Sequence, residues 1–128
     1  MLGGGDLAVQ GRFRNEGLLF LGRGSRLDVA GKFRQLATAA LEISLDASGR
    51  GVVRVEGPRD LAGALWVWRA EGYEPPVDTV LNIVTSNGRV TAHDVFDSVR
   101  SPRYGNGTRK LRVAYATNHV RLRVDRVG

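Results

Sequence analysis

The sequence predicts an all-β protein, a β-solenoid in which short strands stack in successive coils. Three observations indicate this fold class. Apolar residues alternate with other residues over many segments of three to six residues. Glycine is frequent, at 17 of 128 residues, as expected where a chain reverses often. A short motif also recurs at a spacing close to the length of one coil.

The recurring motif begins with two apolar residues two positions apart and ends on a glycine. Its copies are residues 7–11, 27–31 and 53–57, so the spacings are 20 and 26 residues. In a solenoid coil the first and third residues of each copy point into a narrow core. The glycines allow a sharp corner at a place where a Cβ would obstruct the chain. The structural repeat therefore rests on Gly11, Gly31 and Gly57, with Phe13 and Phe33 directed inward after the first two corners.

A second short strand follows each copy of the motif. These strands are "LLFL" from residue 18, "LEISL" from residue 41 and "LWVW" from residue 65. A helix across residues 33–43 is an alternative through Leu36, Ala40 and Ile43, but the repeat favours strands there. Later strands are expected in "VLNIV" (80–84), "LRVAY" (111–115) and "VRLRV" (120–124).

The length of 128 residues fits one domain, which we divide into solenoid coils over residues 7–71 and a C-terminal capping region over residues 72–128. The cap is expected because a solenoid ends in unpaired backbone groups that invite aggregation unless covered. A β-sandwich is the alternative architecture, since it also has many short strands separated by turns.

The order of these motifs resembles the C-terminal end of a right-handed parallel β-helix, as in secreted bacterial surface proteins and autotransporter-like passengers. The resemblance includes Gly72, Tyr73 and Pro75 of "GYEPP" as cap residues, followed by "DVFDSV" and two closing strands. It implies about three to four coils with an irregular C-terminal β cap, and an extracellular or cell-surface location. Asp78 departs from the pattern because it stands near a usual glycine, and the chain is richer in Arg than such helices.

Signals for catalysis, cofactors and metals are sparse. The chain has no Cys, its two imidazoles (His93 and His119) are 26 residues apart, and no nucleophile elbow or phosphate-binding loop occurs. The carboxylates that a polysaccharide-cleaving β-helix would need do not fall in paired positions of the repeat. They are Asp28, Glu42, Asp46, Glu56 and Asp60. We therefore expect no enzyme, no cofactor and no metal site.

The net charge of +6 is compatible with binding of an anionic partner. Residues 99–128 hold eight Lys or Arg residues and one Asp, so the excess lies near the C-terminus. In the register of the repeat, a basic ladder forms on the outer face, and two tryptophans share one face of "ALWVW". The candidate residues for anion or glycan binding are Arg12, Arg14, Lys32, Arg34, Trp66 and Trp68. The alternatives are that the basic residues keep stacked strands soluble and that the tryptophans pack against the cap.

The leading expectation is a noncatalytic structural module, the terminal coils and cap of an extracellular solenoid. Its partner would be the rest of a larger solenoid at the open N-terminal edge. One alternative is a module that binds acidic polysaccharide or cell-wall polymer. Another is a self-assembling subunit that stacks on another copy of itself, giving a dimer or a filament. Nucleic acid is disfavoured because aromatics are not interleaved with the basic strands. No apolar run is long enough for a transmembrane segment, and the N-terminus lacks the order of a signal peptide.

Overall fold

The all-β prediction is confirmed. The computed structural model describes residues 6–22, 24–46, 49–86 and 90–127, and the regular structure in these ranges consists of strands, including those at the place of the helix considered for residues 33–43. The strands are β1 (Asp6–Val9), β2 (Phe13–Asn15), β3 (Leu18–Leu21), β4 (Arg26–Val29), β5 (Phe33–Gln35), β6 (Ala40–Asp46), β7 (Gly49–Arg50), β8 (Val52–Val55), β9 (Arg59–Leu61), β10 (Ala64–Arg69), β11 (Val80–Thr85), β12 (Val90–Asp94), β13 (Ser98–Arg100), β14 (Arg109–Tyr115) and β15 (His119–Arg126).

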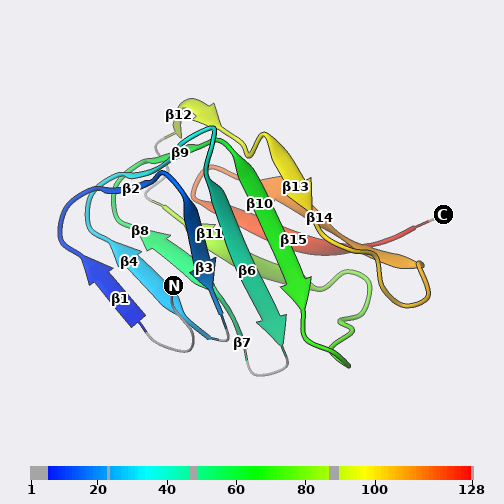
Figure 1. The fold of residues 1–128 in the computed structure, drawn as a ribbon. Coiled ribbons are helices and arrows are strands. Elements are labelled where there is room, and N and C mark those ends of the chain that lie inside the picture. Colours follow the sequence, from blue (N-terminus) through cyan, green and yellow to red (C-terminus); the bar gives the residue numbers. More distant parts are fainter. Residues whose placement is uncertain (1–5, 23, 47–48, 87–89, 128) are drawn as a thin grey trace.

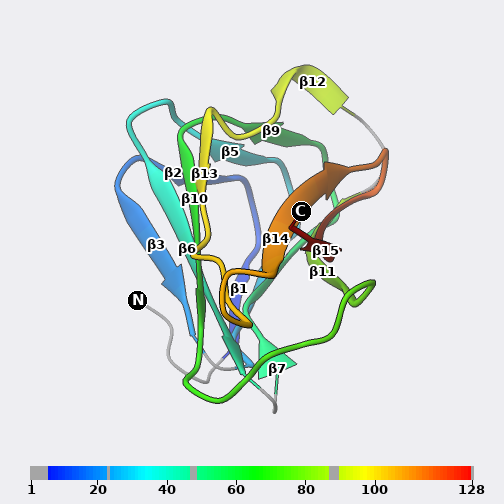
Figure 2. The same ribbon diagram turned by 90° about the vertical axis from the view of Figure 1, so that its right-hand side faces the viewer.

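Consecutive strands enter three sheets in a constant order. Sheet 1 has the order β1-β4-β8-β11-β15-β14, sheet 2 has β2-β5-β9-β12, and sheet 3 has β3-β6-β10-β13, with β7 paired to β6. We call one passage through sheets 1, 2 and 3 a circuit, and the circuits are β1–β3, β4–β6, β8–β10 and β11–β13. In Figure 2 sheet 2 lies across the top, sheet 3 on the left, and β11, β14 and β15 on the right. Neighbouring circuits pair in parallel, unlike the antiparallel sheets of the β-sandwich alternative.

The circuits stack in the register that the repeat predicts. In sheet 1, Leu7 pairs with Leu27, and Leu27 with Val53. In sheet 2, the rings of Phe13 and Phe33 are stacked, with centroids 5.8 Å apart and planes 2° from parallel. Figure 1 shows β3, β6, β10 and β13 side by side in sheet 3. Side chains along each strand point alternately inward and outward, and the inward rows of the three sheets form one core.

The glycine corners stack directly on one another. Gly31 N donates a hydrogen bond to Gly11 O (3.0 Å), and Gly57 N donates to Gly31 O (3.1 Å). A Cβ at Gly57 would lie 2.5 Å from Gly31 O, whereas a Cβ at Gly11 would meet no atom within 4 Å. Glycine is therefore required at Gly31 and Gly57, where a Cβ would meet the backbone of the preceding circuit, but not at Gly11.

Two buried amides link the circuits inside the stack. Asn15 Nδ2 donates hydrogen bonds to Gln35 Oε1 (3.0 Å) and Ala40 O (2.9 Å), and Gln35 Nε2 donates to Ala62 O (2.8 Å) and Ala64 O (3.0 Å). Asn15 is 5% exposed and Gln35 is 1% exposed. These bonds satisfy polar groups that would otherwise be buried at a cost, and they tie each circuit to the next one.

Parallel pairing continues beyond residue 72, where we place the start of the capping region. β11, β12 and β13 pair in parallel with β8, β9 and β10, and only then does the pairing change. β15 is antiparallel to β11, and β14 is antiparallel to β15. The fourth circuit is hard to recognise in the sequence because residues 70–79 separate β10 from β11, a longer connection than residues 22–25 between β3 and β4.

The two ends of the stack differ. At the N-terminal end all three sheets finish in the same circuit, on β1, β2 and β3. At the other end, sheets 2 and 3 finish on β12 and β13, while sheet 1 continues for two more strands, β15 and β14. The first end is therefore level and the second is stepped.

Candidate functional site

The basic ladder lies on the outer face of sheet 2, where most of its members have acidic partners. Arg14 and Arg34 are paired on β2 and β5. Arg14 Nε lies 2.8 Å from Glu16 Oε1, and Asp60 Oδ2 lies 3.6 Å from Arg34 Nε and 3.8 Å from Lys32 Nζ. The carboxylates reduce the repulsion between stacked cations, which costs tenths of a kcal/mol to about 1 kcal/mol per pair.

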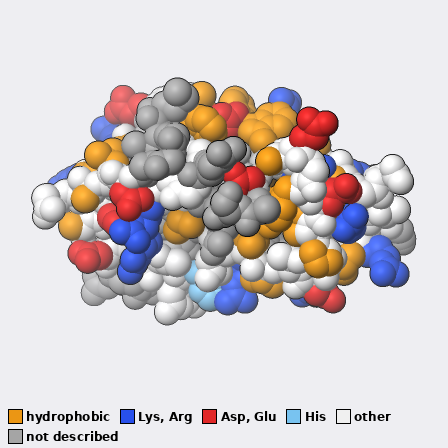
Figure 3. All heavy atoms as spheres, turned by 90° about the horizontal axis from the view of Figure 1, so that it is seen from below, with side chains coloured by type: hydrophobic (Ala, Val, Ile, Leu, Met, Phe, Trp, Pro, Cys, Tyr) orange, Lys and Arg blue, Asp and Glu red, His pale blue; other side chains and the backbone are white. Residues whose placement is uncertain are grey.

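Arg12 differs from the rest of the ladder. It is exposed and makes no ion pair within the described ranges. Lys32 and Arg34 share Asp60, so the ladder keeps a small positive charge besides that of Arg12. On the face seen from below in Figure 3, basic and acidic side chains likewise lie close together among apolar ones.

Trp66 and Trp68 both lie on the outer face of sheet 3. Their neighbours Leu65 and Val67 are fully buried, and Trp68 is 39% exposed. Trp68 Nε1 donates a hydrogen bond to Glu42 Oε1 (2.7 Å) on the neighbouring strand β6. Trp66 is half-buried between its strand partners Glu42 and Arg100. The two indoles thus share one face, and a carboxylate holds one of them in place.

The segment around Gly72, Tyr73 and Pro75 is held by residues from distant parts of the chain. Tyr104 OH donates a hydrogen bond to Pro75 O (2.7 Å), and Arg69 donates to Tyr73 O (2.6 Å). The guanidinium groups of Arg69 and Arg109 lie 4.0 and 5.0 Å from the centre of the Tyr104 ring. Gly72 has a φ of 84°, which favours glycine.

Burial raises the pKa of the Tyr104 phenol above its usual 10.0, against the opposing effect of Arg109 and Arg69. The phenol therefore stays protonated and continues to donate its hydrogen bond. Sequence reasoning did not single out Tyr104, because it lies 29 residues from Pro75 in an irregular segment. A lone Tyr flanked by Gly and Arg residues carries no periodic signal.

Asp78 has a φ of 75°, in the left-handed region that favours glycine. The resemblance described above leads us to expect glycine near this position. Asp78 instead donates its backbone N–H to Val124 O (2.9 Å), and its carboxylate accepts a hydrogen bond from Arg123 (3.2 Å). These contacts hold the non-glycine residue in the conformation of the turn.

Arg59 was not recognised as a core residue, although its side chain is fully buried at 0% exposure. It pairs with Phe33 on β5 and therefore follows Phe13 and Phe33 in the same row of sheet 2. Its guanidinium donates hydrogen bonds to Ala116 O (2.6 Å) and Ser86 Oγ (3.2 Å). The signal was present, since Arg59 stands two residues after Gly57, as each Phe stands two residues after its glycine.

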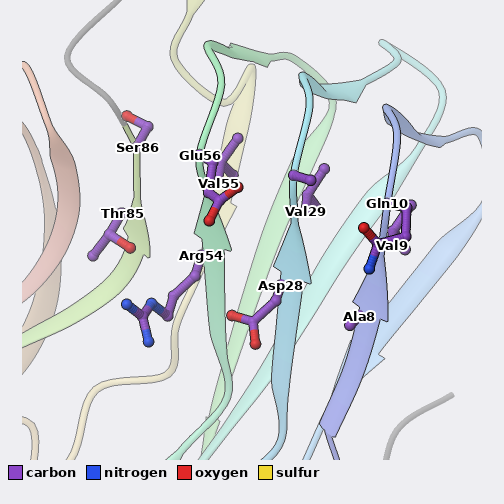
Figure 4. Close-up of a pocket in the computed structure, with 11 residues that line it drawn as sticks. Ala8, Val9, Gln10, Asp28, Val29, Arg54, Val55, Glu56, Thr85 and Ser86 are labelled. Atoms are coloured by element: carbon purple, nitrogen blue, oxygen red, sulfur yellow. The ribbon is translucent and has the colours of Figure 1, made fainter.

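An open groove of about 530 Å³ runs across the outer face of sheet 1 (Figure 4). Asp28 and Arg54 project into it from adjacent strands, and Thr85 belongs to the next strand. The carboxylate of Asp28 also accepts a hydrogen bond from Arg26 Nε (3.0 Å). Glu56 lies at the rim rather than in the row of Asp28, so the groove does not place these two carboxylates opposite each other on neighbouring strands.

No group of three His, Asp or Glu residues that could hold a metal occurs among the described residues. The side chain of His93 lies outside the described part of the structure. His119 begins β15, and its Nε2 is buried without a hydrogen-bond partner in the described ranges. Burial, with Arg121 and Arg59 nearby, lowers the pKa of His119 below its usual 6.5.

We expect stability to fall when the pH drops below about 6.5, because the unfolded chain then takes up a proton at His119 before the folded chain does. This contribution is fully present above pH 6.5 and is lost as the pH falls towards the lower pKa of the folded state. Urea unfolding between pH 7.5 and 5.5, for the wild-type protein and His119→Gln, measures it. A slope that His119→Gln leaves unchanged would assign the pH dependence to other groups.

Neither a protein-family model nor a curated protein matches the chain. No helix that could cross a membrane occurs in the ranges that the structure describes.

Proposed function

We propose that the chain is a noncatalytic structural module that forms the terminal coils and cap of a right-handed parallel β-helix. The parent would be an extracellular bacterial surface protein, in line with the resemblance noted in the sequence. The constant order of the three sheets and the parallel pairing of successive circuits support the solenoid. The observation that carries the proposal is the exposure of core-type residues in the first circuit.

Residues of the first circuit occupy the same rows as buried residues but are uncovered on one side. Leu7 is 42% exposed, whereas its partner Leu27 and the next residue in the row, Val53, are each 0% exposed. Val9 and Phe13 are only partly buried, whereas their partners Val29 and Phe33 are 1% and 0% exposed. A preceding coil would bury these side chains at about 25 cal/mol per Å² of apolar area and would satisfy the free backbone groups of β1, β2 and β3.

The antiparallel pair β14–β15 supports the role of a cap. It adds charged residues to the outer rows of sheet 1, where Asp125 forms ion pairs with Arg112 (2.6 Å) and Arg123 (3.3 Å). A reversal of strand direction with charged outer rows interrupts the flat, repetitive edge on which another parallel coil could be placed.

Duplication of residues 6–25 in tandem tests the solenoid. Asp6 pairs with Arg26 and Phe13 with Phe33, so this insertion adds one whole circuit in register. We expect a soluble protein with more β-sheet signal in circular dichroism and a melting temperature equal to or above that of the wild type. The reason is that stability of stacked repeats is roughly a sum of repeat and interface terms.

The matched control carries the same added residues in shuffled order before an unchanged residue 6, so the added segment cannot form a circuit in register. We expect this variant to keep the β-sheet signal and the melting temperature of the wild type. If the tandem copy gains no β-sheet signal over the shuffled copy, the chain is a fixed globular fold rather than an extendable stack, and the structural-module proposal fails.

The same edge could be covered by a second copy of the chain, the self-assembly alternative. Sedimentation velocity over a range of concentrations distinguishes the two occupants. A concentration-dependent dimer that Leu7→Lys abolishes favours a second copy, and a monomer at all concentrations favours a preceding coil. Leu7 is already 42% exposed at the end of its row, so a lysine there can extend into solvent.

A further inference from the structure

A cleft at the stepped end of the stack lies between the segment after β13 and the strand β14. Its volume is about 360 Å³. The residues that line it include Val99, Ser101, Arg103, Lys110, Leu111 and Val113. It lies at the end opposite β1–β3, so it is independent of the edge on which the proposed function rests.

Both strands that border the cleft have a free edge. β13 is hydrogen-bonded only to β10 within the described sheets, and β14 pairs with β15 on one side. On its other side, β14 is bridged only at its first residue, where Arg109 and Tyr104 exchange backbone hydrogen bonds of 3.0 and 2.9 Å. Along residues 110–114, no other described strand pairs with this side of β14, so an added strand can pair there.

The floor of the cleft is apolar. Val99 is the last residue in the row Leu19, Leu41, Leu65 and Val99, and it is 43% exposed because no further strand of sheet 3 covers it. Leu111 is buried and Val113 is half-buried on β14. An apolar side chain inserted here would continue the row of sheet 3.

The rim of the cleft is basic, and of its three cations only Arg112 has a carboxylate partner, Asp125, within the described ranges. Arg103 and Lys110 form no ion pair within the described ranges, and neither does Arg100 nearby. Lys110 has Asp125 as its strand partner, but the Asp125 carboxylate is held by Arg112 and Arg123. This contrasts with the ladder on sheet 2, where Asp60 and Glu16 compensate the cations.

A polar atom inside the cleft also lacks a partner. Ser101 Oγ is buried and makes no hydrogen bond within the described residues. Buried hydroxyl groups normally have partners, so this atom is available to a ligand that can donate or accept one hydrogen bond.

We propose that this cleft binds an acidic peptide segment in extended conformation. The peptide adds to the free edge of β14, alternate apolar side chains cover Val99, and alternate carboxylates reach Arg103 and Lys110. An extended strand presents side chains on two faces with a period of two, which matches an apolar floor beside a basic rim. A polyanion without apolar groups would use the rim but neither the floor nor the strand edge.

The probe is a short fluorescent peptide in which Glu and Val alternate, measured by fluorescence anisotropy. We expect saturable binding that weakens as salt rises from about 50 to about 300 mM, because screening reduces the charge contribution. A peptide with Gln for Glu tests the charge, and a peptide with N-methylated backbone tests strand addition. Each should bind about tenfold more weakly or worse, and equal binding by either one overturns the proposal.

The protein variant is the double substitution Arg103→Gln with Lys110→Gln, which should weaken peptide binding about fivefold. The matched control, Arg12→Gln with Arg14→Gln, removes the same charge at the opposite end and should change binding less than about twofold. Circular dichroism checks that both variants fold. Equal losses in both variants, or binding of heparin without binding of the peptide, overturn the assignment.

Discussion

Gly57→Ala is expected to lower the free energy of unfolding by about 3 kcal/mol, with Gly31→Ala intermediate and Gly11→Ala nearly neutral. The added Cβ at Gly57 would lie 2.5 Å from Gly31 O, and the one at Gly31 would lie 3.0 Å from Arg12 N and from Gly11 C. Both neighbours are backbone, which cannot move aside without breaking the hydrogen bonds of the corner, so the cost is that of overpacking.

Gly11→Ala is the control, because a Cβ there meets nothing within 4 Å. Alanine at such a site changes stability by at most about 1 kcal/mol in either direction. Urea unfolding followed by circular dichroism gives all three values. A loss that is the same at the three corners would mean that glycine is needed for its backbone conformation and not for stacking.

Arg59→Met is expected to destabilise the fold by about 3 kcal/mol, the second large effect. The side chain is 0% exposed and donates hydrogen bonds to Ala116 O and Ser86 Oγ. Methionine fills similar space but leaves the Ala116 carbonyl without this donor, and an unsatisfied buried group costs about 1–3 kcal/mol. The loss of stability should be larger than for a surface arginine, because Arg59 joins the third circuit to the antiparallel pair β14–β15.

Arg54→Met provides the comparison, since Arg54 is exposed on β8 and should change stability by less than about 0.5 kcal/mol. Arg59→Lys keeps the charge but loses the planar group that reaches two acceptors, so an intermediate loss is expected. Equal stability of Arg59→Met and the wild type would show that the two hydrogen bonds contribute nothing net to the fold.

The rows of apolar core residues could be predicted from the sequence for a physical reason. Parallel stacking without a shift places equivalent residues in one row, so a row of core residues appears as a period in the chain. Leu7, Leu27 and Val53 are such a row, and so are Phe13 and Phe33. The fourth circuit follows a long connection over residues 70–79, which interrupts the regular spacing by which the earlier circuits are recognised in the sequence.

The polar contacts could not be derived in the same way. The position of Arg59 in the repeat indicates that it points inward, but its acceptors Ser86 and Ala116 lie 27 and 57 residues away in the sequence, so the spacing of the repeat does not indicate them. The Tyr104 cluster joins residues about thirty positions apart without any periodic signal. The ion pairs of Asp60 likewise depend on which side chains the corners bring within reach.

The difference between the level and the stepped end limits the symmetry of any assembly. A head-to-tail contact would join the end at which all three sheets finish in one circuit to the end at which sheet 1 is two strands longer. The two extra strands, β15 and β14, prevent all three sheets from pairing at once. Two level ends can meet face to face, and such a contact is isologous and closes after two copies. Self-association through the level ends should therefore stop at a two-fold dimer and should not continue into a fibre.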